Sequence, residues 1–127
     1  DLGDIVEVDA QGYVTIRGRL KRFAKIGGEM VSLTAVEANA SALWPDQNHV
    51  AIAVADPKKG EQIVLLTEKP DAARAELLDW CQAQGVAELS VPRKIIPIEA
   101  VPLLGTGKTD YVTAQKLAEA KLVKAAA

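Results

Sequence analysis

The sequence predicts a small α+β domain, an N-terminal β-hairpin followed by a central mixed sheet that helices flank. The chain has 127 residues, of which 49% are hydrophobic and 25% charged, which is ordinary for one globular domain with a buried core. Short stretches of alternating apolar residues are interspersed with longer stretches whose apolar residues fall on one helical face. Runs rich in glycine, proline and aspartate separate these stretches, as turns do.

The first predicted element is the hairpin, with strands over 4–8 and 13–17 and a turn between them. A further extended stretch is expected over 23–31. Within it Gly27 and Gly28 should mark a bulge, or a close approach by another backbone or a ligand, because glycine is rare inside a regular strand.

A helix should follow. Thr34 and Glu37 have the spacing of a capping box, and Ser32 is the alternative cap. Trp44-Pro45 should end this helix. The remaining predicted elements are strands over 50–54 and 62–67, a helix that Pro70-Asp71 opens and Gly85 ends, an edge strand over 94–98, and a helix over 113–124.

Composition argues against several classes of protein. The net charge of −2 gives no general attraction to nucleic acid or to an anionic membrane, and no apolar run approaches the roughly 20 residues of a membrane span. The single cysteine, Cys81, cannot form an internal disulfide, which suits a reducing compartment. His49 starts an apolar strand and is expected to be structural. No catalytic triad, metal-ligand cluster or carboxylate pair stands out, so we expect no bound metal and no self-contained active site.

Five basic residues lie close together without an acid among them: Arg17, Arg19, Lys21, Arg22 and Lys25. One interpretation is a solvated strand face. The other is that Gly18-Arg19 places a guanidinium against sugar hydroxyls or a phosphate. A nucleic-acid role is disfavoured, because the run is short and Phe23 is its only aromatic residue.

The stretch Pro102–Lys108, Pro-Leu-Leu-Gly-Thr-Gly-Lys, carries one lysine on a glycine-rich turn before a polar-capped helix. It does not match a phosphate-binding P-loop, because glycines fall only at 105 and 107 and the preceding residues predict a loop rather than a strand. We therefore interpret Lys108 as a mobile donor of positive charge.

Asp4, Gly18-Arg19-Leu20-Lys21, Gly28 and Gly105-Thr106-Gly107-Lys108 resemble, in order and spacing, the C-terminal domain of the adenylate-forming enzymes. The resemblance covers essentially the whole chain. It implies a small mobile lid domain over 19–127, preceded by a hinge approach over 1–18. Within the superfamily the chain looks most like the bifunctional acyl-[acyl-carrier-protein] synthetase / 2-acylglycerophosphoethanolamine acyltransferases. The chain opens on Asp1-Leu2 directly before a predicted strand, so we expect it to be a piece of a longer protein.

The resemblance also implies roles for single residues. Asp4 and Arg19 match groups that bind the ribose and phosphates of ATP, although Leu2 stands where the family usually has a threonine. Lys21 matches the hinge about which the domain turns against a larger N-terminal domain.

Two further regions acquire roles in the same way. Gly28, with Gly27 beside it, matches the glycine that lines the pantetheine tunnel, and Lys25 matches a lysine that some members use in the second half-reaction. Lys108 matches the lysine of the adenylation step.

For the full-length protein the resemblance implies ATP and Mg²⁺, bound mainly by the missing N-terminal part. The other partners would be a fatty acid, the phosphopantetheine of acyl carrier protein or coenzyme A, and lysophosphatidylethanolamine. The place would be the cytoplasmic face of a bacterial inner membrane, with this fragment itself soluble and inactive alone. Two alternatives stay open, the C-terminal domain of a long-chain acyl-CoA synthetase and a non-catalytic module that binds a carrier protein.

Overall fold

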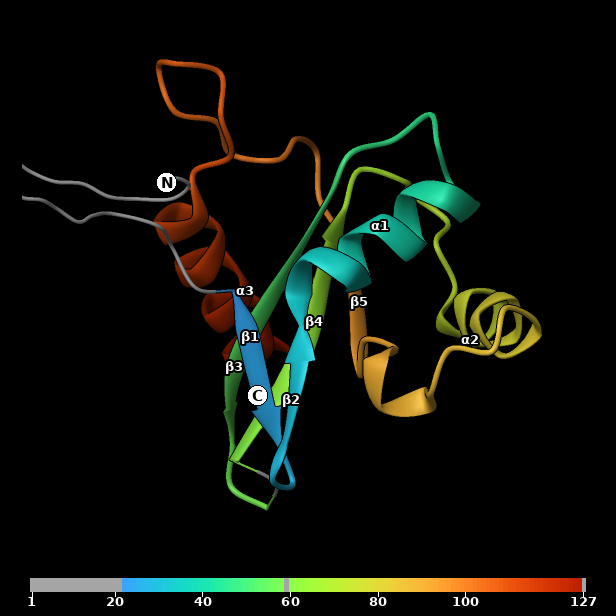
Figure 1. Cartoon of the computed structure of the whole chain (residues 1–127). Coiled ribbons are helices and arrows are strands. Elements are labelled where there is room, and N and C mark those ends of the chain that lie inside the picture. Colours follow the sequence, from blue (N-terminus) through green and yellow to red (C-terminus); the bar gives the residue numbers. More distant parts are fainter. Residues whose placement is uncertain (1–21, 59, 127) are drawn as a thin grey trace, which may run out of the picture.

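The computed structural model describes residues 22–58 and 60–126 as an α+β domain (Figure 1). The predicted hairpin over 4–17 lies outside the described residues, so its prediction stays untested. The elements are, in chain order, β1 (Phe23–Ile26), β2 (Glu29–Ser32), α1 (Leu33–Leu43), β3 (His49–Asp56), β4 (Gly60–Thr67), α2 (Arg74–Ala83), the 3-10 turn η1 (Glu88–Ser90), β5 (Lys94–Pro97) and α3 (Tyr111–Ala126).

The sheet is mixed, as the sequence predicts, and β4 is its central strand. β3 and β4 form a long antiparallel pair whose register runs from His49↔Thr67 to Asp56↔Gly60. The opposite edge of β4 pairs antiparallel with β1 at Ile26↔Gly60 and parallel with β5 from Val64↔Lys94 to Thr67↔Pro97. Within the described part of the chain β5 pairs with β4 alone, so it is the edge strand expected there.

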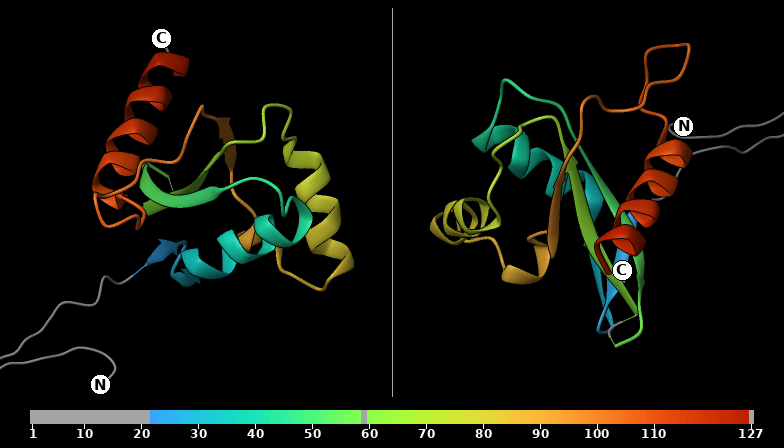
Figure 2. Two further views of the ribbon diagram at one scale, coloured as in Figure 1. Left: turned by 90° about the horizontal axis from the view of Figure 1, so that it is seen from above. Right: turned by 180° about the vertical axis from the view of Figure 1, so that it is seen from behind.

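Helices cover both faces of the β3–β4 pair, with α1 and α2 on one face and α3 on the other (Figure 2). The sequences of β3 and β4 are nearly continuous apolar runs because each face is buried. Alternate residues face opposite sides. Ala51, Ile63 and Leu65 therefore lie in the core under α1 and α2, whereas Val50 and Val64 lie under α3.

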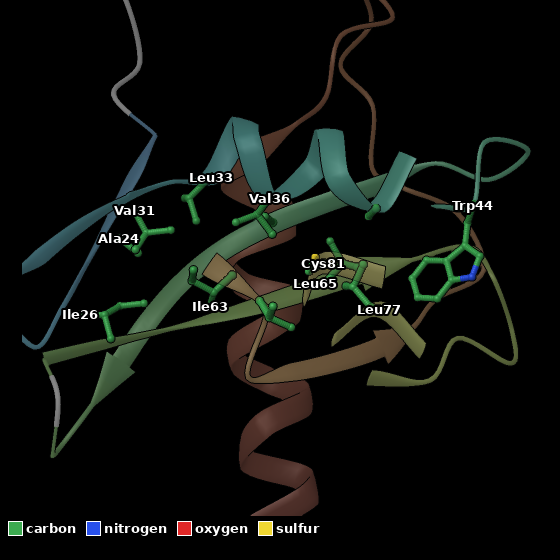
Figure 3. Close-up of a cluster of buried hydrophobic side chains, with 13 residues drawn as sticks. Ala24, Ile26, Val31, Leu33, Val36, Trp44, Ile63, Leu65, Leu77 and Cys81 are labelled. Atoms are coloured by element: carbon green, nitrogen blue, oxygen red, sulfur yellow. The ribbon is translucent and has the colours of Figure 1, made fainter. Parts of the chain in front are cut away.

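Figure 3 shows the larger of the two cores, with side chains of α1, α2 and β4 gathered around Leu65 and Leu77. Both of these leucines are fully buried, and Trp44 closes the core at the end of α1. No helix within residues 22–58 and 60–126 combines the length and the apolar character that crossing a bilayer requires.

The glycine pair does not form a bulge, so that alternative is wrong, whereas the close approach of a ligand stays a prediction. Gly27 (φ 57°) and Gly28 (φ 90°) form the two-residue turn of a hairpin between β1 and β2, with Ile26 opposite Glu29. Two consecutive residues with positive φ are the requirement of a type I′ turn, whose twist matches that of the strands. A bulge needs only one such residue.

Helix starts were predicted less accurately than helix stops. Ser32, the alternative cap, is the N-cap of α1, and its hydroxyl accepts a hydrogen bond from Ala35 N at 3.1 Å. The capping box of Thr34 and Glu37 is not formed, since the Glu37 carboxylate bonds Arg22 instead. The helix nevertheless ends at Trp44, as expected. α2 begins at Arg74 and not at Pro70, and α3 begins at Tyr111, two residues before the predicted start.

Candidate functional site

Residues 101–110, called the lysine loop below, project from one end of the domain (orange in Figure 1). The loop is a small hairpin, in which Leu103 bridges Thr109 and Leu104 N donates to the Lys108 carbonyl at 2.7 Å. Gly107 N donates to the Leu104 carbonyl at 2.8 Å and closes the turn, with φ at 91°. A three-residue turn that ends on a glycine in this region is a regular hairpin connection. The loop therefore has a defined geometry with Lys108 at the exit of its turn.

The Lys108 side chain is exposed on this hairpin. It forms no ion pair with any residue of 22–58 or 60–122. The same loop also exposes two large apolar side chains to solvent, Leu103 (61% exposed) and Leu104 (47% exposed). The ammonium is thus free to reach a group outside the domain.

Both ends of the lysine loop are attached to the body of the domain. At the first end the Glu68 carboxylate accepts a hydrogen bond from Val101 N at 2.8 Å and another from Asn48 Nδ2 at 3.2 Å. At the second end Asp110 accepts from Thr113 N at 3.1 Å and from the Thr113 hydroxyl at 2.7 Å. These two hydrogen bonds lower the pKa of Asp110, and an ionised cap also interacts favourably with the N-terminus of α3. The predicted polar cap before the last helix is present.

The His49 ring is engaged within the domain. Its Nδ1 lies 2.7 Å from Thr67 Oγ1, and its Nε2 lies 3.0 Å from the Trp44 carbonyl oxygen. With both nitrogens occupied, this histidine has the structural role that its place in the sequence suggested.

The β1–β2 turn lies at the opposite end of the domain from the lysine loop, as Figure 1 and the right view of Figure 2 show. A Cβ built on Gly27 or Gly28 would meet no atom of the described chain within 4 Å, so the space beside the turn is open. Lys25 is exposed on β1 directly opposite Met30, and its backbone N–H donates to Glu61 Oε1 at 2.6 Å. The domain therefore does not bring Lys108 together with Lys25 and the glycines. It carries them on two separate surfaces.

Curated proteins similar to this chain include several CoA ligases. The chain is 37% identical over 109 residues to a 3-methylmercaptopropionyl-CoA ligase of Ruegeria lacuscaerulensis, a match that covers 84% of this chain and 20% of that protein. It is 32% identical over 109 residues to a long-chain-fatty-acid–CoA ligase of Mycobacterium tuberculosis, covering 84% of this chain and 21% of that protein. The chain thus spans about a fifth of the length of these relatives.

The fold agrees with the sequence matches, although no family model matches the chain. The solved structure of a Mycobacterium tuberculosis fatty acyl CoA synthetase superposes with a TM-score of 0.71 at 26% identity, over 91% of this chain and 23% of that one. This chain is a C-terminal domain of the adenylate-forming enzymes. These matches support the superfamily and its acyl-CoA ligases, and they give no support to the bifunctional acyltransferase branch.

Three residues to which the adenylate-forming resemblance assigns roles, Asp4, Arg19 and Lys21, lie outside the described residues. Their roles in binding ATP and in the hinge stay predictions.

One member of the basic run behaves differently from the prediction in this adenylate-forming domain. Arg22 is not on a solvated face, because its side chain is only 12% exposed and donates to both carboxylate oxygens of Glu37 and to the Ala51 carbonyl. The guanidinium also lies 4.1 Å from the centre of the Tyr111 ring. Sequence reasoning missed Glu37 and Tyr111 as partners, since neither lies near Arg22 in the chain. The one sequence signal for this ion pair was the position of Glu37, an acid next to the buried face of the amphipathic helix α1.

Proposed function

We propose that this chain is the mobile lid of an ATP-dependent acyl-activating ligase, and that Lys108 supplies the positive charge for the adenylation step. The observation that carries the proposal is the place of Lys108, exposed at the turn of a hydrogen-bonded hairpin that projects from the domain. The similarity to CoA ligases supports the same reaction class.

The chemistry of adenylation explains why a single ammonium is useful. A carboxylic acid is already ionised at neutral pH, so no general base is needed. A carboxylate oxygen attacks the α-phosphorus of ATP, the new P–O bond forms, and pyrophosphate leaves with the electron pair of the broken bond. The attacking carboxylate, the phosphates of ATP and the departing pyrophosphate are all anionic. An ammonium in contact with the carboxylate and phosphate oxygens offsets their repulsion, and one such positioned donor commonly contributes about 3 kcal/mol.

The second half-reaction needs a different surface. A thiol sulfur attacks the acyl carbonyl carbon, AMP leaves, and the thiol proton is lost to solvent or to a base. Lys108 must move away from the reaction centre so that the thiol can enter. We propose that Lys25 and the Gly27–Gly28 turn then lie at the reaction centre in place of Lys108. The two surfaces lie at opposite ends of the domain, which suits a lid that turns between half-reactions. Lys21 is our candidate for the hinge, and the open space at Gly28 would leave room for a pantetheine arm.

The substrates and partners are part of the proposal. ATP with Mg²⁺ would be held mainly by the larger domain, with Asp4 and Arg19 on its ribose and phosphates. The acid substrate would be a fatty acid. The names of the two ligases described above favour coenzyme A as the acceptor. The narrower prediction was acyl carrier protein as acceptor followed by acyl transfer to lysophosphatidylethanolamine at the membrane. A basic surface over residues 17–25 would suit the docking of an acidic carrier protein, but the Arg22 side chain is only 12% exposed and is not available for it, so this narrower prediction has less support.

The test of the proposed function is Lys108→Ala in the full-length protein that contains this chain. Exchange of pyrophosphate into ATP in the presence of fatty acid should fall at least about a hundredfold. Transfer of a supplied acyl-adenylate to the thiol should be retained. Lys94→Ala, which removes an exposed lysine of β5, is the matched control and should change neither rate. Unchanged pyrophosphate exchange in Lys108→Ala would instead favour a non-catalytic binding module.

Two further measurements complete the test. The isolated chain should release no pyrophosphate from ATP and fatty acid, because it lacks the larger domain. With the full-length protein, the rate of thioester formation on coenzyme A compared with that on acyl carrier protein decides between the two acceptors.

A further inference from the structure

Arg22, the residue before β1, is held in place by several hydrogen bonds. Its guanidinium donates to Glu37 Oε1 at 2.8 Å, to Glu37 Oε2 at 2.7 Å and to the Ala51 carbonyl at 2.6 Å. A two-pronged contact with a carboxylate fixes the plane of the guanidinium as well as its position. The backbone of Arg22 is also fixed, since its carbonyl accepts from Leu33 N at 2.9 Å.

The fixed guanidinium plane supports the first residue of α3. The Tyr111 ring lies with its centre 4.1 Å from Arg22 Cζ, well within the range of a cation–π contact. The next turn of α3 is attached to the same edge of β3 that Arg22 contacts at Ala51, because Gln115 Nε2 donates to the Ala53 carbonyl at 2.9 Å. Tyr111 and Gln115 are four residues apart and so lie on one helix face. The start of α3 is therefore fastened at two successive points along the edge of β3.

The start of α3 in turn fixes the lysine loop. Tyr111 is the third residue after Lys108, and the Asp110 between them donates its N–H to the Pro102 carbonyl at 2.9 Å, which closes the stem of the loop. A rotation of the first turn of α3 would carry that stem with it. Because Lys108 stands at the far end of the hairpin, a small rotation at Tyr111 becomes a larger displacement at the ammonium.

We propose that Arg22 and Tyr111 are positioning residues for the adenylation half-reaction, which together aim Lys108 through the stem of its loop. This inference rests on the proposed function of Lys108. Displacement of a reacting group by about 1 Å can reduce a rate about a hundredfold, so contacts made remotely from the ammonium are able to control it. The β1–β2 turn lies at the other end of the domain, so the thioester half-reaction should not depend on Tyr111.

The experiment compares Tyr111→Leu with Tyr111→Phe in the full-length protein. Tyr111→Leu removes the aromatic face on which the guanidinium rests, and the adenylation kcat should fall about tenfold. The KM values for fatty acid and ATP should stay within about twofold, because ground-state binding is not touched. Tyr111→Phe keeps the ring and should retain the parent rate. Val112→Ala changes the adjacent residue, which is 68% exposed, and serves as the matched control.

The thioester half-reaction is the internal check on folding. Transfer from supplied acyl-adenylate should proceed at the parent rate in Tyr111→Leu, which would show that the lid is folded and still turns. Equal slowing of both half-reactions, an unchanged adenylation rate, or an equal loss in Tyr111→Phe would each overturn the positioning role. Lys108→Ala separates the two proposals. If it abolishes adenylation while Tyr111→Leu has no effect, only the positioning role fails, whereas an active Lys108→Ala enzyme removes the proposed function itself.

Discussion

The Glu37 carboxylate and the Arg22 guanidinium together satisfy both polar backbone groups of one residue on β3. Ala51 N donates to Glu37 Oε2 at 2.8 Å, and the Ala51 carbonyl accepts from Arg22 Nη2 at 2.6 Å. Among the strands that the structure describes, β3 pairs only with β4. The other edge of β3, which includes the N–H and the carbonyl of Ala51, therefore forms no hydrogen bonds with another of these strands. An unpaired strand edge is a template for unwanted association. The ion pair therefore protects the edge of the sheet as well as joining β1 to α1.

Replacement of Glu37 by alanine should destabilise the domain severely. It leaves a guanidinium that is only 12% exposed without its counter-ion, and it leaves Ala51 N without an acceptor. Losing one partner of a largely buried pair should lower the free energy of unfolding by about 3 kcal/mol. Urea unfolding of the chain measures this quantity. Glu29→Ala, which removes an exposed glutamate at the start of β2, should change it by less than about 0.5 kcal/mol. A loss of under about 1 kcal/mol in Glu37→Ala would contradict the buried-pair interpretation.

Replacement of Gly28 by alanine should separate the role of the turn in folding from its role in the reaction. The left-handed backbone (φ 90°) makes any Cβ unfavourable by about 1 kcal/mol, although no atom of the described chain lies within 4 Å of it. Gly85→Ala is a matched control, because Gly85 has a φ of 80° and equally open surroundings at the end of α2. Both variants should lose similar stability in urea unfolding.

In the full-length protein only Gly28→Ala should impair catalysis. Thioester formation from supplied acyl-adenylate should fall about tenfold, since a methyl group would narrow the path that we propose for the pantetheine arm. Pyrophosphate exchange should continue at the parent rate. Equal rates of thioester formation in Gly28→Ala and Gly85→Ala would remove the Gly28 turn from the proposed thiol path.

The parts of the fold that could be predicted from sequence depend on neighbours in the chain. The end of α1 at Trp44 follows from the proline after it, and Gly85 ends α2 because only a glycine adopts its conformation without strain. The Lys108 turn is local in the same sense. The glycine pair of β1–β2 was misinterpreted although it is also local, because the apolar residues on both sides of it imitate a single strand.

The parts that could not be predicted depend on partners distant in the chain. Arg22 and Glu37 are 15 residues apart, so nothing in the run of basic residues shows that one of them is buried in an ion pair. The parallel pairing of β5 with β4 and the contact between Arg22 and Tyr111 likewise exist only once the sheet has formed. For the candidate site the consequence is direct. The sequence draws attention to Lys108, the group that we propose for the adenylation step, whereas the contacts that we propose position it can be found only in the fold.

Cys81 should be unreactive in the folded chain. Its side chain lies in the core between α1 and α2, it is 1% exposed, and burial raises the pKa of the thiol. Since the thiolate is the reactive form, both effects slow modification. A thiol-specific reagent at pH 7.5 should label the chain only after addition of urea to unfold it. Rapid labelling of the native chain would show that the core opens readily or is not packed as described.

Asp110 should make the stability of the folded chain depend on pH in the acidic range. The pKa of its carboxyl is lowered, first by the hydrogen bond from Thr113 N and second by that from the Thr113 hydroxyl. A depressed pKa in the folded state means that the unfolded chain binds the proton more readily. The stabilisation is therefore fully present above the pKa that Asp110 has in the unfolded chain. It is lost as the pH falls through the lower pKa that Asp110 has in the folded chain.

The variant that isolates this charge is Asp110→Asn, because asparagine keeps an oxygen that can accept from Thr113 N and cannot ionise. At pH 7 the parent chain should be more stable in urea unfolding than the variant. The difference should shrink as the pH is lowered below about 4, where an ordinary aspartate becomes protonated. The pKa of Asp71 is also lowered, by Lys69, but both proteins share this group and its contribution cancels in the comparison. A difference in stability that stays constant from pH 7 to pH 3 would mean that the cap acts through its shape and not through its charge.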